Sequence, residues 1–131
     1  MKVLLTGSSK GIGYKIAKDL LAEGHELALH YNKMNLLDAL LKKDKTGSFS
    51  IQADLSQQEE IKKMVENTIG KLSFPDCIIN NAGIAESADI SLDINDWSKM
   101  FDKTIDVNLK APSLIFKEFL KYKREKKLIQ D

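Results

Sequence analysis

A cluster of three glycines near the N-terminus constrains the fold more than any other feature of the sequence. The string Gly-Ser-Ser-Lys-Gly-Ile-Gly occupies residues 7–13 and follows an apolar run over residues 2–6. Beyond the first glycines, Ile12, Ile16 and Leu20 recur at the spacing of one helix face. Short apolar runs form buried strands, and glycine permits sharp backbone turns. The segment therefore predicts a strand, a tight turn and a helix in succession.

This turn has the composition of an anion-binding loop. Glycine has no side chain to keep a diphosphate from the backbone, and the first N–H groups of a helix are free to bind phosphate. Without its context, a glycine-rich turn could equally be a flexible surface loop. The strand before it and the helix after it favour a dinucleotide site. The predicted cofactor-binding residues of the turn are Gly7, Ser9, Lys10, Gly11, Ile12 and Gly13.

Strands and helices alternate along the rest of the chain. Gly24 marks the end of the first helix, Ser56 and Glu59 form a capping-box pattern, and Asp93 or Asn95 would cap the last helix. Right-handed crossovers place such helices on both faces of a parallel sheet, which predicts a doubly wound α/β fold. The later expected strands are residues 26–31, 49–53 and 77–80, and the later expected helices are residues 35–43, 56–70 and 93–126.

The size and charge of the chain narrow its class. It has 131 residues, 43% hydrophobic and 30% charged, as in one ordinary globular domain. The formal net charge of +1 provides no global field that would favour nucleic acid or a membrane surface. No run approaches the roughly 20 apolar residues that a membrane span requires. The single cysteine, Cys77, cannot form an intramolecular disulfide, so we expect a reducing, cytoplasmic setting.

Four segments resemble motifs of the short-chain dehydrogenase/reductase family, in that family's order and spacing. Residues 6–13, 53–55, 80–83 and 106–109 run Thr-Gly-Ser-Ser-Lys-Gly-Ile-Gly, Ala-Asp-Leu, Asn-Asn-Ala-Gly and Asp-Val-Asn-Leu. The chain looks most similar to the 3-oxoacyl-carrier-protein reductases, although sugar, steroid and pterin reductases share these strings. The resemblance implies a Rossmann-like sheet of order 3-2-1-4 in a single NAD(P)-binding domain over residues 1–131.

The resemblance also implies roles for residues after the third and fourth strands. Asp54 would contact the adenine, and Leu55 would line the adenine pocket. Asn81, Ala82 and Gly83 would lie against the adenine ribose and support the central sheet. Taken without the resemblance, Asp54 is a turn residue at a helix entry and Asn81 a loop-stabilising amide.

The end of the second strand favours NADP over NAD. An acid about 20 residues beyond the glycines would bind the ribose hydroxyls of NAD and repel a 2′-phosphate. Residues 30–34 are His-Tyr-Asn-Lys-Met and contain no acid. Lys33 and Lys10 would attract the phosphate, beside Tyr31 and Asn32, unless both lysines are ordinary solvated cations. NADP (NADPH) is therefore the expected cofactor, and NAD is less favoured.

The same resemblance implies hydride transfer between a nicotinamide and a small carbonyl or alcohol substrate. In the family, a Ser polarises the substrate oxygen and a Tyr transfers the proton, helped by a Lys four residues later. Asn108 matches the Asn of the family's proton relay and is the predicted catalytic residue. Pro112 has no N–H, so it predicts a kink that frees the carbonyl of Asn108. A kinked packing helix without this role is the alternative.

The Ser and the Tyr-x-x-x-Lys motif are expected beyond the last residue. Residues 127–129, Lys-Leu-Ile, suggest the start of a fifth strand, so we expect a domain that is incomplete at its C-terminus and inactive alone. Matches to Tyr-x-x-x-Lys at residues 14–18 and 122–126 lie on the wrong helices for this chemistry. The alternatives to a reductase are a nucleotide-binding or subunit-pairing fragment without turnover, and a nonfunctional remnant.

A sheet of this order leaves the fourth strand as an open edge. Such an edge, together with apolar faces of the last helix, promotes association between chains. We therefore expect a homo-oligomer or a marginally stable chain.

The remaining chemical groups predict no further site. His25 and His30 are too few and too badly spaced for a metal site, so each is expected to be a loop or strand-end histidine. The basic residues within 121–127 could bind an anion, but a solvated helix end, where cations suit the helix dipole, is favoured.

Overall fold

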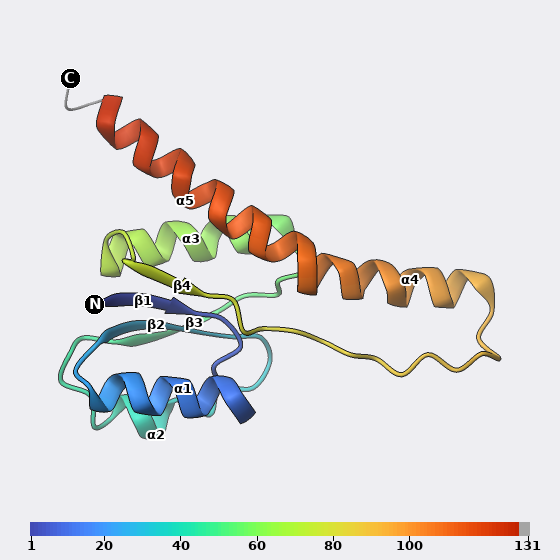
Figure 1. The fold of residues 1–131 in the computed structure, drawn as a ribbon, viewed down its shortest axis with the longest axis horizontal. Helices are drawn as coiled ribbons and strands as arrows, with labels where there is room; N and C mark the ends of the chain where they lie inside the picture. The colour runs from blue at the N-terminus through green and yellow to red at the C-terminus, as the bar shows by residue number, and fades with distance from the viewer. Residues whose placement is uncertain (129–131) are drawn as a thin grey trace.

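Four parallel strands form the centre of the molecule, with helices on both faces of the sheet (Figure 1). This computed structural model describes residues 1–128. The predicted doubly wound α/β class is confirmed. The elements in chain order are β1 (Lys2–Leu5), α1 (Gly11–Ala22), β2 (Glu26–Tyr31), α2 (Asp38–Leu41), β3 (Phe49–Gln52), α3 (Gln58–Leu72), β4 (Cys77–Ile79), α4 (Ile94–Ile105), η1 (Asp106–Lys110) and α5 (Ala111–Leu128).

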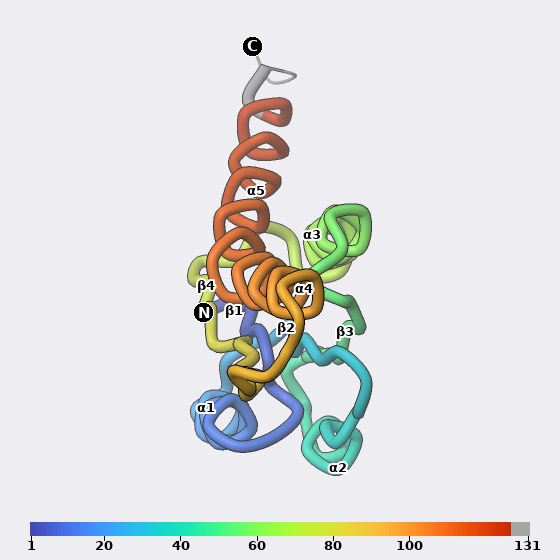
Figure 2. The backbone as a smooth tube through the Cα atoms, turned by 90° about the vertical axis from the view of Figure 1, so that its right-hand side faces the viewer, coloured from blue at the N-terminus to red at the C-terminus, as the bar shows by residue number. Residues whose placement is uncertain are grey.

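The strand order is β3-β2-β1-β4, as predicted. Leu5 of β1 is in register with Leu29 of β2 on one side and with Ile79 of β4 on the other. Because every pair is parallel, all four strands end at the same edge of the sheet. Figure 2 views the molecule from that edge and shows α1 and α2 on one face, with α3 and α5 on the other.

Two hydrophobic clusters hold the layers together. Successive side chains of a strand point to opposite faces, so Val3 and Leu5 pack toward one face while Leu4 packs toward the other. The first cluster joins β2 to α1, and the second joins β2 to α3 and α5 through Ala28 and Ile115. Both faces of the sheet are therefore buried, as parallel sheets require.

Helix α2 is shorter than predicted, because polar side chains on both flanks hold the backbone in turns. The amide of Leu37 donates to Asn35 Oδ1 at 3.0 Å. On the other side, the Asp44 carboxylate accepts hydrogen bonds from the amides of Thr46, Gly47 and Ser48. Side chains of this kind compete with helical hydrogen bonding. They confine the helix to Asp38–Leu41.

The capping box predicted for α3 is wrong. The N-cap is Gln57, and its side chain makes no capping hydrogen bond. Ser56 instead donates its hydroxyl to Asp54 Oδ1 at 2.7 Å, and Glu60 rather than Glu59 accepts from the Asp54 amide at 2.6 Å. The helix continues to Leu72, slightly beyond the predicted end near residue 70.

The last helical stretch begins at the predicted cap and changes its form in the middle. Asp93 accepts hydrogen bonds from the amides of Asn95 and Asp96. At η1 the backbone widens into a π-helical turn, in which the Ala111 amide donates to the Asp106 carbonyl. The predicted kink at Pro112 therefore takes the form of a wide turn just before the proline, and the axis changes direction between α4 and α5 (Figure 1).

The predicted start of a fifth strand at residues 127–129 is wrong for its first two residues, which belong to α5. The third, Ile129, lies outside the described residues. Helical periodicity simply continues through the basic segment, and no turn residue precedes it.

The edge strand β4 has no strand on its outer side within residues 1–128, and the outer side of α4 and α5 exposes apolar side chains. Within residues 1–128, β4 pairs only with β1, and its three residues are half-buried. On the last helical stretch, Ile115 and Phe119 are buried, whereas several other large apolar side chains face solvent. The exposed apolar row comprises Trp97, Phe101, Ile105, Leu109, Phe116 and Leu120.

Ile115 and Ile90 are chemically identical side chains with opposite environments, at 1% and 93% exposure. Replacing Ile115 with Ala should lower the free energy of unfolding by about 2–5 kcal/mol, because it leaves a cavity against α3. Ile90→Ala should change it by less than about 0.5 kcal/mol. Urea unfolding monitored by circular dichroism measures both values, and equal losses would contradict the packing described.

Candidate functional site

The loops that follow β1, β2, β3 and β4 meet at one edge of the sheet, and this edge points toward the viewer in Figure 2. In open parallel α/β sheets, this edge is where ligands bind. The structure brings together residues 6–13, 31–33, 53–55 and 80–84 there. These are the segments in which the cofactor residues were predicted.

Two of the three glycines in the turn are required by close backbone approach. A Cβ on Gly7 would lie 2.7 Å from Ala82 Cα. A Cβ on Gly13 would collide with the Gly7 carbonyl and lie 2.5 Å from Asn81 Nδ2. Gly11 differs, because no atom lies within 4 Å of the Cβ position and its φ of 56° favours glycine. The turn is packed tightly on its inner side and open at Gly11.

Thr6 and Asn81 lock the turn to the loop after β4. Thr6 Oγ1 accepts hydrogen bonds from the amides of Asn81 and Ala82 at 3.1 and 3.0 Å. The Asn81 side-chain amide donates to the carbonyls of Thr6 and Gly7 at 3.1 and 2.9 Å. The Asn81 side chain therefore holds the loop after β4 against the turn. Thr6 was not predicted as a site residue, although a buried hydroxyl at the end of a strand that leads into the turn could have indicated it.

His30 ties the turn to the two neighbouring strands. The Gly7 amide donates to His30 Nδ1 at 3.1 Å, and His30 Nε2 lies 2.9 Å from the Ala53 carbonyl oxygen. The amide and hydroxyl of Ser8 both donate to the His30 carbonyl, at 2.9 and 2.8 Å. Burial lowers the pKa of His30, and the hydrogen bond to Ala53 and the charge of Asp54 offset this only in part. His30 lies at a strand end, as predicted, but it is a buried part of the site.

The outer part of the turn presents unpaired backbone donors. In the part of the chain that the structure describes, none of the amides of residues 9–13 donates to a protein acceptor. They form the N-terminus of α1, where the helix dipole also favours negative charge. Lys10 and Ile12 beside them are exposed, Ile12 at 75%. This arrangement can hold an anion.

Asp54 lies at the end of β3 with its carboxylate partly engaged. Its Oδ1 accepts from the amide and hydroxyl of Ser56 at 2.9 and 2.7 Å. Burial raises the pKa of Asp54, but hydrogen bonds from Ser56 and the charges of Lys103 and Lys33 more than offset this, so the pKa lies below its ordinary value. The carboxylate is therefore ionised at neutral pH. Leu55 packs in the hydrophobic core and is 5% exposed.

The loop after β2 brings Lys33 to the same edge of the sheet. Lys33 is exposed and close enough to Asp54 to lower its pKa. The Asn32 carbonyl accepts a hydrogen bond from Gln52 Nε2 at 3.0 Å, which joins the ends of β2 and β3. Tyr31 is half-buried and packs against the cluster beneath α1. The loop after β2 therefore places the Lys33 cation near the Asp54 carboxylate, with the ends of β2 and β3 held together.

Asn108 connects the widened turn of the last helix to the loop after β4. Its Oδ1 accepts from the Ile84 amide and its Nδ2 donates to the Ile84 carbonyl, both at 2.8 Å. The same Oδ1 lies 3.5 Å from the Cβ position of Gly83. Pro112 has no N–H to offer to the carbonyl of Asn108, four residues earlier. The Asn108 side chain thus fixes the position of Ile84. The part in the proton relay that was predicted for this residue would therefore belong to its main-chain carbonyl.

Tyr122 has the wrong environment for an acid-base tyrosine. Its hydroxyl donates to Glu66 Oε1 at 2.7 Å and so joins α5 to α3. This hydrogen bond, with burial and nearby carboxylates, raises the pKa of Tyr122 to about 12. Tyr14 packs against the cluster beneath α1, away from Asn108.

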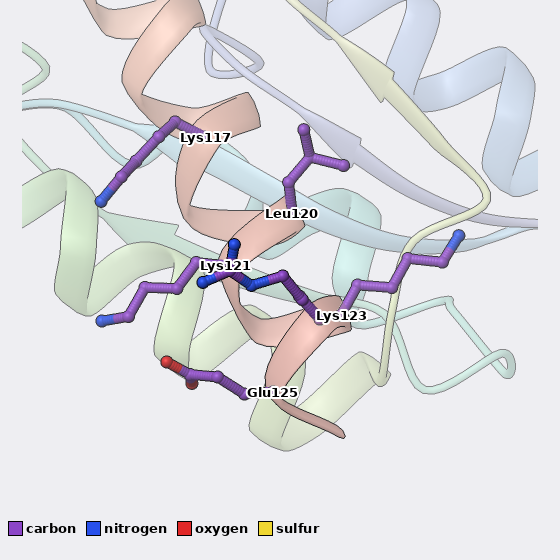
Figure 3. Close-up of a pocket in the computed structure, with 6 residues that line it drawn as sticks. Lys117, Leu120, Lys121, Lys123 and Glu125 are labelled. Carbon is purple, nitrogen blue, oxygen red and sulfur yellow. The ribbon is translucent and has the colours of Figure 1, made fainter. Parts of the chain in front are cut away.

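The basic residues of α5 surround a surface depression but do not form a common anion site. Figure 3 shows Lys117 and Lys121 directed to one side of Leu120 and Lys123 to the other. Lys117 is paired with Glu118, and Glu125 lines the same depression. This arrangement is that of a solvated helix surface, as predicted.

Within residues 1–128, no three or more His, Cys, Asp or Glu side chains form a cluster that could hold a metal ion. None of the helices in this part of the chain is long and apolar enough to cross a membrane.

Comparison with known proteins points to the same family as the motifs. Residues 1–128 match the family model for short chain dehydrogenases. The 3-oxoacyl-[acyl-carrier-protein] reductase of Staphylococcus epidermidis is 33% identical over 112 residues, covering 82% of this chain and 45% of that protein. The NADPH-dependent pterin aldehyde reductase of Arabidopsis thaliana is 28% identical over 121 residues, covering 90% and 49%. The chain spans about half the length of these curated relatives.

Solved structures share the fold. A blue fluorescent protein from a metagenomic library, in complex with NADPH, has a TM-score of 0.77 at 28% identity, covering 91% of this chain and 49% of that one. A metagenomic short-chain oxidoreductase in complex with NADP has a TM-score of 0.75 at 27% identity, covering 92% and 55%. The match over residues 1–128, the sheet order and the packed glycine turn together establish that the chain belongs to the short-chain dehydrogenase/reductase family.

Proposed function

We propose that this chain binds NADP as part of an oxidoreductase that transfers hydride between the nicotinamide and a small carbonyl or alcohol substrate. The observation that carries the proposal is the row of unpaired amides over residues 9–13, beside the open space at Gly11. A diphosphate can approach this backbone closely and accept hydrogen bonds from it. When bound, NADPH would supply the hydride. Two proteins of similar fold were solved with NADPH or NADP, which supports this class of cofactor.

We assign the 2′-phosphate of the cofactor to Lys33 and Lys10, with Tyr31 and Asn32 beside the ribose. Both lysines are exposed at the ligand-binding edge of the sheet, and residues 30–34 contain no carboxylate. Asp54 is the acid near Lys33, but Ser56 engages one of its oxygens and two lysines balance its charge. A phosphate dianion therefore meets net positive charge. This favours NADP over NAD.

The adenosine part of the cofactor would lie between the loops after β3 and β4. Asp54 Oδ2 accepts no hydrogen bond within residues 1–128 and would face the adenine. Leu55 would support this position from the core. The backbone of Asn81, Ala82 and Gly83, fixed by Thr6 and Asn108, would lie against the ribose.

Asn108 would position the proton relay of the reaction. Its side chain holds Ile84 and so fixes the loop that leaves the nucleotide site. Its carbonyl, four residues before Pro112, would be available to hold a water molecule. We assign the serine and tyrosine of the family's chemistry to no residue of this chain.

The single cysteine favours a reducing, cytoplasmic setting for the protein.

A second candidate is a nucleotide-binding or subunit-pairing role without turnover. The exposed apolar row on α4 and α5 favours it. Titration with NADPH, followed by an assay of NADPH oxidation with a carbonyl substrate, separates the candidates. Binding without oxidation would support the second candidate. No binding by the folded chain would contradict the first candidate and the nucleotide-binding form of the second.

Cofactor preference should depend on the charge at Lys33. We expect Lys33→Asp to weaken NADPH binding by about tenfold or more, because a charge-assisted hydrogen bond is replaced by repulsion. NADH binding should be unchanged or tighter. Titration of both nucleotides by fluorescence measures the ratio of the two dissociation constants. Lys42→Asp, the same change on an exposed residue after α2, is the control; an unchanged ratio in Lys33→Asp would refute the assignment.

Gly13 should tolerate no side chain. Gly13→Ala should lower the free energy of unfolding by about 1–3 kcal/mol and weaken NADPH binding, because the new Cβ pushes the Gly7 carbonyl and Asn81 aside. Gly70→Ala is the matched control, since no atom lies within 4 Å of its Cβ position in α3. That change should stabilise the chain by about 0.5–1 kcal/mol. Thermal unfolding and nucleotide titration of both variants provide the test, and normal binding by Gly13→Ala would be inconsistent with the site.

We further propose that the chain forms a homo-oligomer through the exposed apolar row. Phe101→Glu should weaken association by about tenfold or more, because it places a charge within a desolvated contact. Lys99→Glu, an exposed neighbour on α4, should have a much smaller effect. Analytical ultracentrifugation over a concentration series gives the association constants. A wild-type chain that stays monomeric at high concentration would rule this out.

A further inference from the structure

The His30 ring lies between two loops of the nucleotide site, and both of its nitrogens are hydrogen-bonded. Nδ1 is 3.1 Å from the Gly7 amide nitrogen, and Nε2 is 2.9 Å from the Ala53 carbonyl oxygen. A backbone N–H can only donate and a carbonyl oxygen can only accept. The ring must therefore accept at Nδ1 and donate at Nε2. This arrangement is satisfied only by the neutral imidazole with its proton on Nε2.

We infer that His30 is a positioning residue for the dinucleotide site, and that protonation of its ring weakens dinucleotide binding. The inference rests on the nucleotide-binding role proposed above. His30 directs the amides of Gly7 and Ser8 inward, to its ring and to its carbonyl. The amides of residues 9–13 have no acceptor within residues 1–128, and Lys10, Gly11 and Ile12 are exposed whereas Gly13 is buried. One residue thus divides the turn into a part held by protein and a part available to the ligand.

A protonated ring cannot make the bond to Gly7. Its Nδ1–H would face the Gly7 N–H, donor against donor. His30 is 1% exposed and Ser8 is fully buried, which leaves no ready access for water to take the place of the lost acceptor. Because the Gly7 carbonyl packs against Gly13 and accepts from Asn81, a displacement of Gly7 would move the rest of the turn.

The charged groups around His30 do not compensate for the hydrogen bond to Gly7 that a protonated ring loses. The charged groups on the adjoining loops are Asp54 after β3, Lys33 after β2 and Lys10 in the turn. Asp54 favours the protonated ring, yet burial outweighs it and keeps the pKa of His30 below 6.5. The pKa of Asp54 itself lies below 3.8, so this carboxylate stays ionised as the pH falls from neutral toward that value.

Asparagine and glutamine separate the two hydrogen bonds of the ring. In His30→Asn, the side-chain oxygen lies near the former Nδ1 and can accept from Gly7, but nothing titrates. In His30→Gln, the side-chain nitrogen lies near the former Nε2 and can donate to Ala53, while Gly7 loses its acceptor. His25→Gln removes the other histidine, which lies before β2 and contacts Met1 and Glu23. It is the control for general loss of an imidazole.

The binding test compares dissociation constants of acid-stable NADP⁺ by calorimetry from neutral pH downward. The cofactor's phosphate also titrates near about pH 6, so the informative quantity is the ratio of wild-type to His30→Asn at each pH. We expect a ratio near one at neutral pH that rises to about ten as the ring protonates. His30→Gln should bind about tenfold more weakly already at neutral pH, and His25→Gln should follow the wild type. A ratio that stays near one, or normal binding by His30→Gln, would overturn the inference.

A second test needs no nucleotide, so its result separates this inference from the proposed function. Long-range ¹H–¹⁵N NMR of the ring should show the Nε2–H tautomer at neutral pH. Because the folded pKa lies below the unfolded one, the folded state binds fewer protons, and the free energy of unfolding should fall as the pH drops below about 6.5. His30→Asn should lack this part of the decline. An Nδ1–H tautomer or an identical decline in His30→Asn would overturn the role of His30 in holding the turn. If that role is supported but neither the wild type nor any variant binds nucleotide, the proposed function fails, and the predicted effect on binding fails with it.

Discussion

The backbone of Gly13 lies so close to the Gly7 carbonyl that no side chain fits between them. This contact joins the start of α1 to the end of β1, and Asn81 joins both to the loop after β4 by donating to the carbonyls of Thr6 and Gly7. The position of the turn is therefore set by the packed edge of the sheet. Loops held in this way are preorganised, which reduces the entropy lost when a ligand binds.

The turn divides its donors between protein and ligand. Gly7 and Ser8 donate inward to His30, while the amides of residues 9–13 have no acceptor among the described residues. A buried N–H without a partner costs folding free energy, whereas an exposed N–H at a helix N-terminus is free to bind an anion. The same edge places Lys33 close enough to Asp54 for the lysine charge to lower the pKa of this carboxyl.

Much of this arrangement could be predicted from local patterns. Apolar runs located all four strands, and the order of motifs predicted the strand order 3-2-1-4. The roles of Thr6 and His30 could not be, because their partners lie on other strands and sequence spacing does not reveal a ring tautomer. Ser56 and Glu59 matched a capping box, yet the Asp54 turn competed for Ser56 and Glu60 reached the free amide instead. Pro112 predicted a break but not its π-helical form, because a missing N–H does not specify which hydrogen bonds the neighbouring residues make instead.

Amide hydrogen exchange at the turn, measured residue by residue with and without NADPH, reveals whether these backbone donors hold a diphosphate. Gly7 and Ser8 should exchange slowly in both states, because His30 already holds them. Residues 9–13 should exchange rapidly in the free protein and become protected when NADPH is added. If these amides are already protected in the free protein, or stay unprotected at saturating NADPH, the turn does not hold the cofactor's diphosphate.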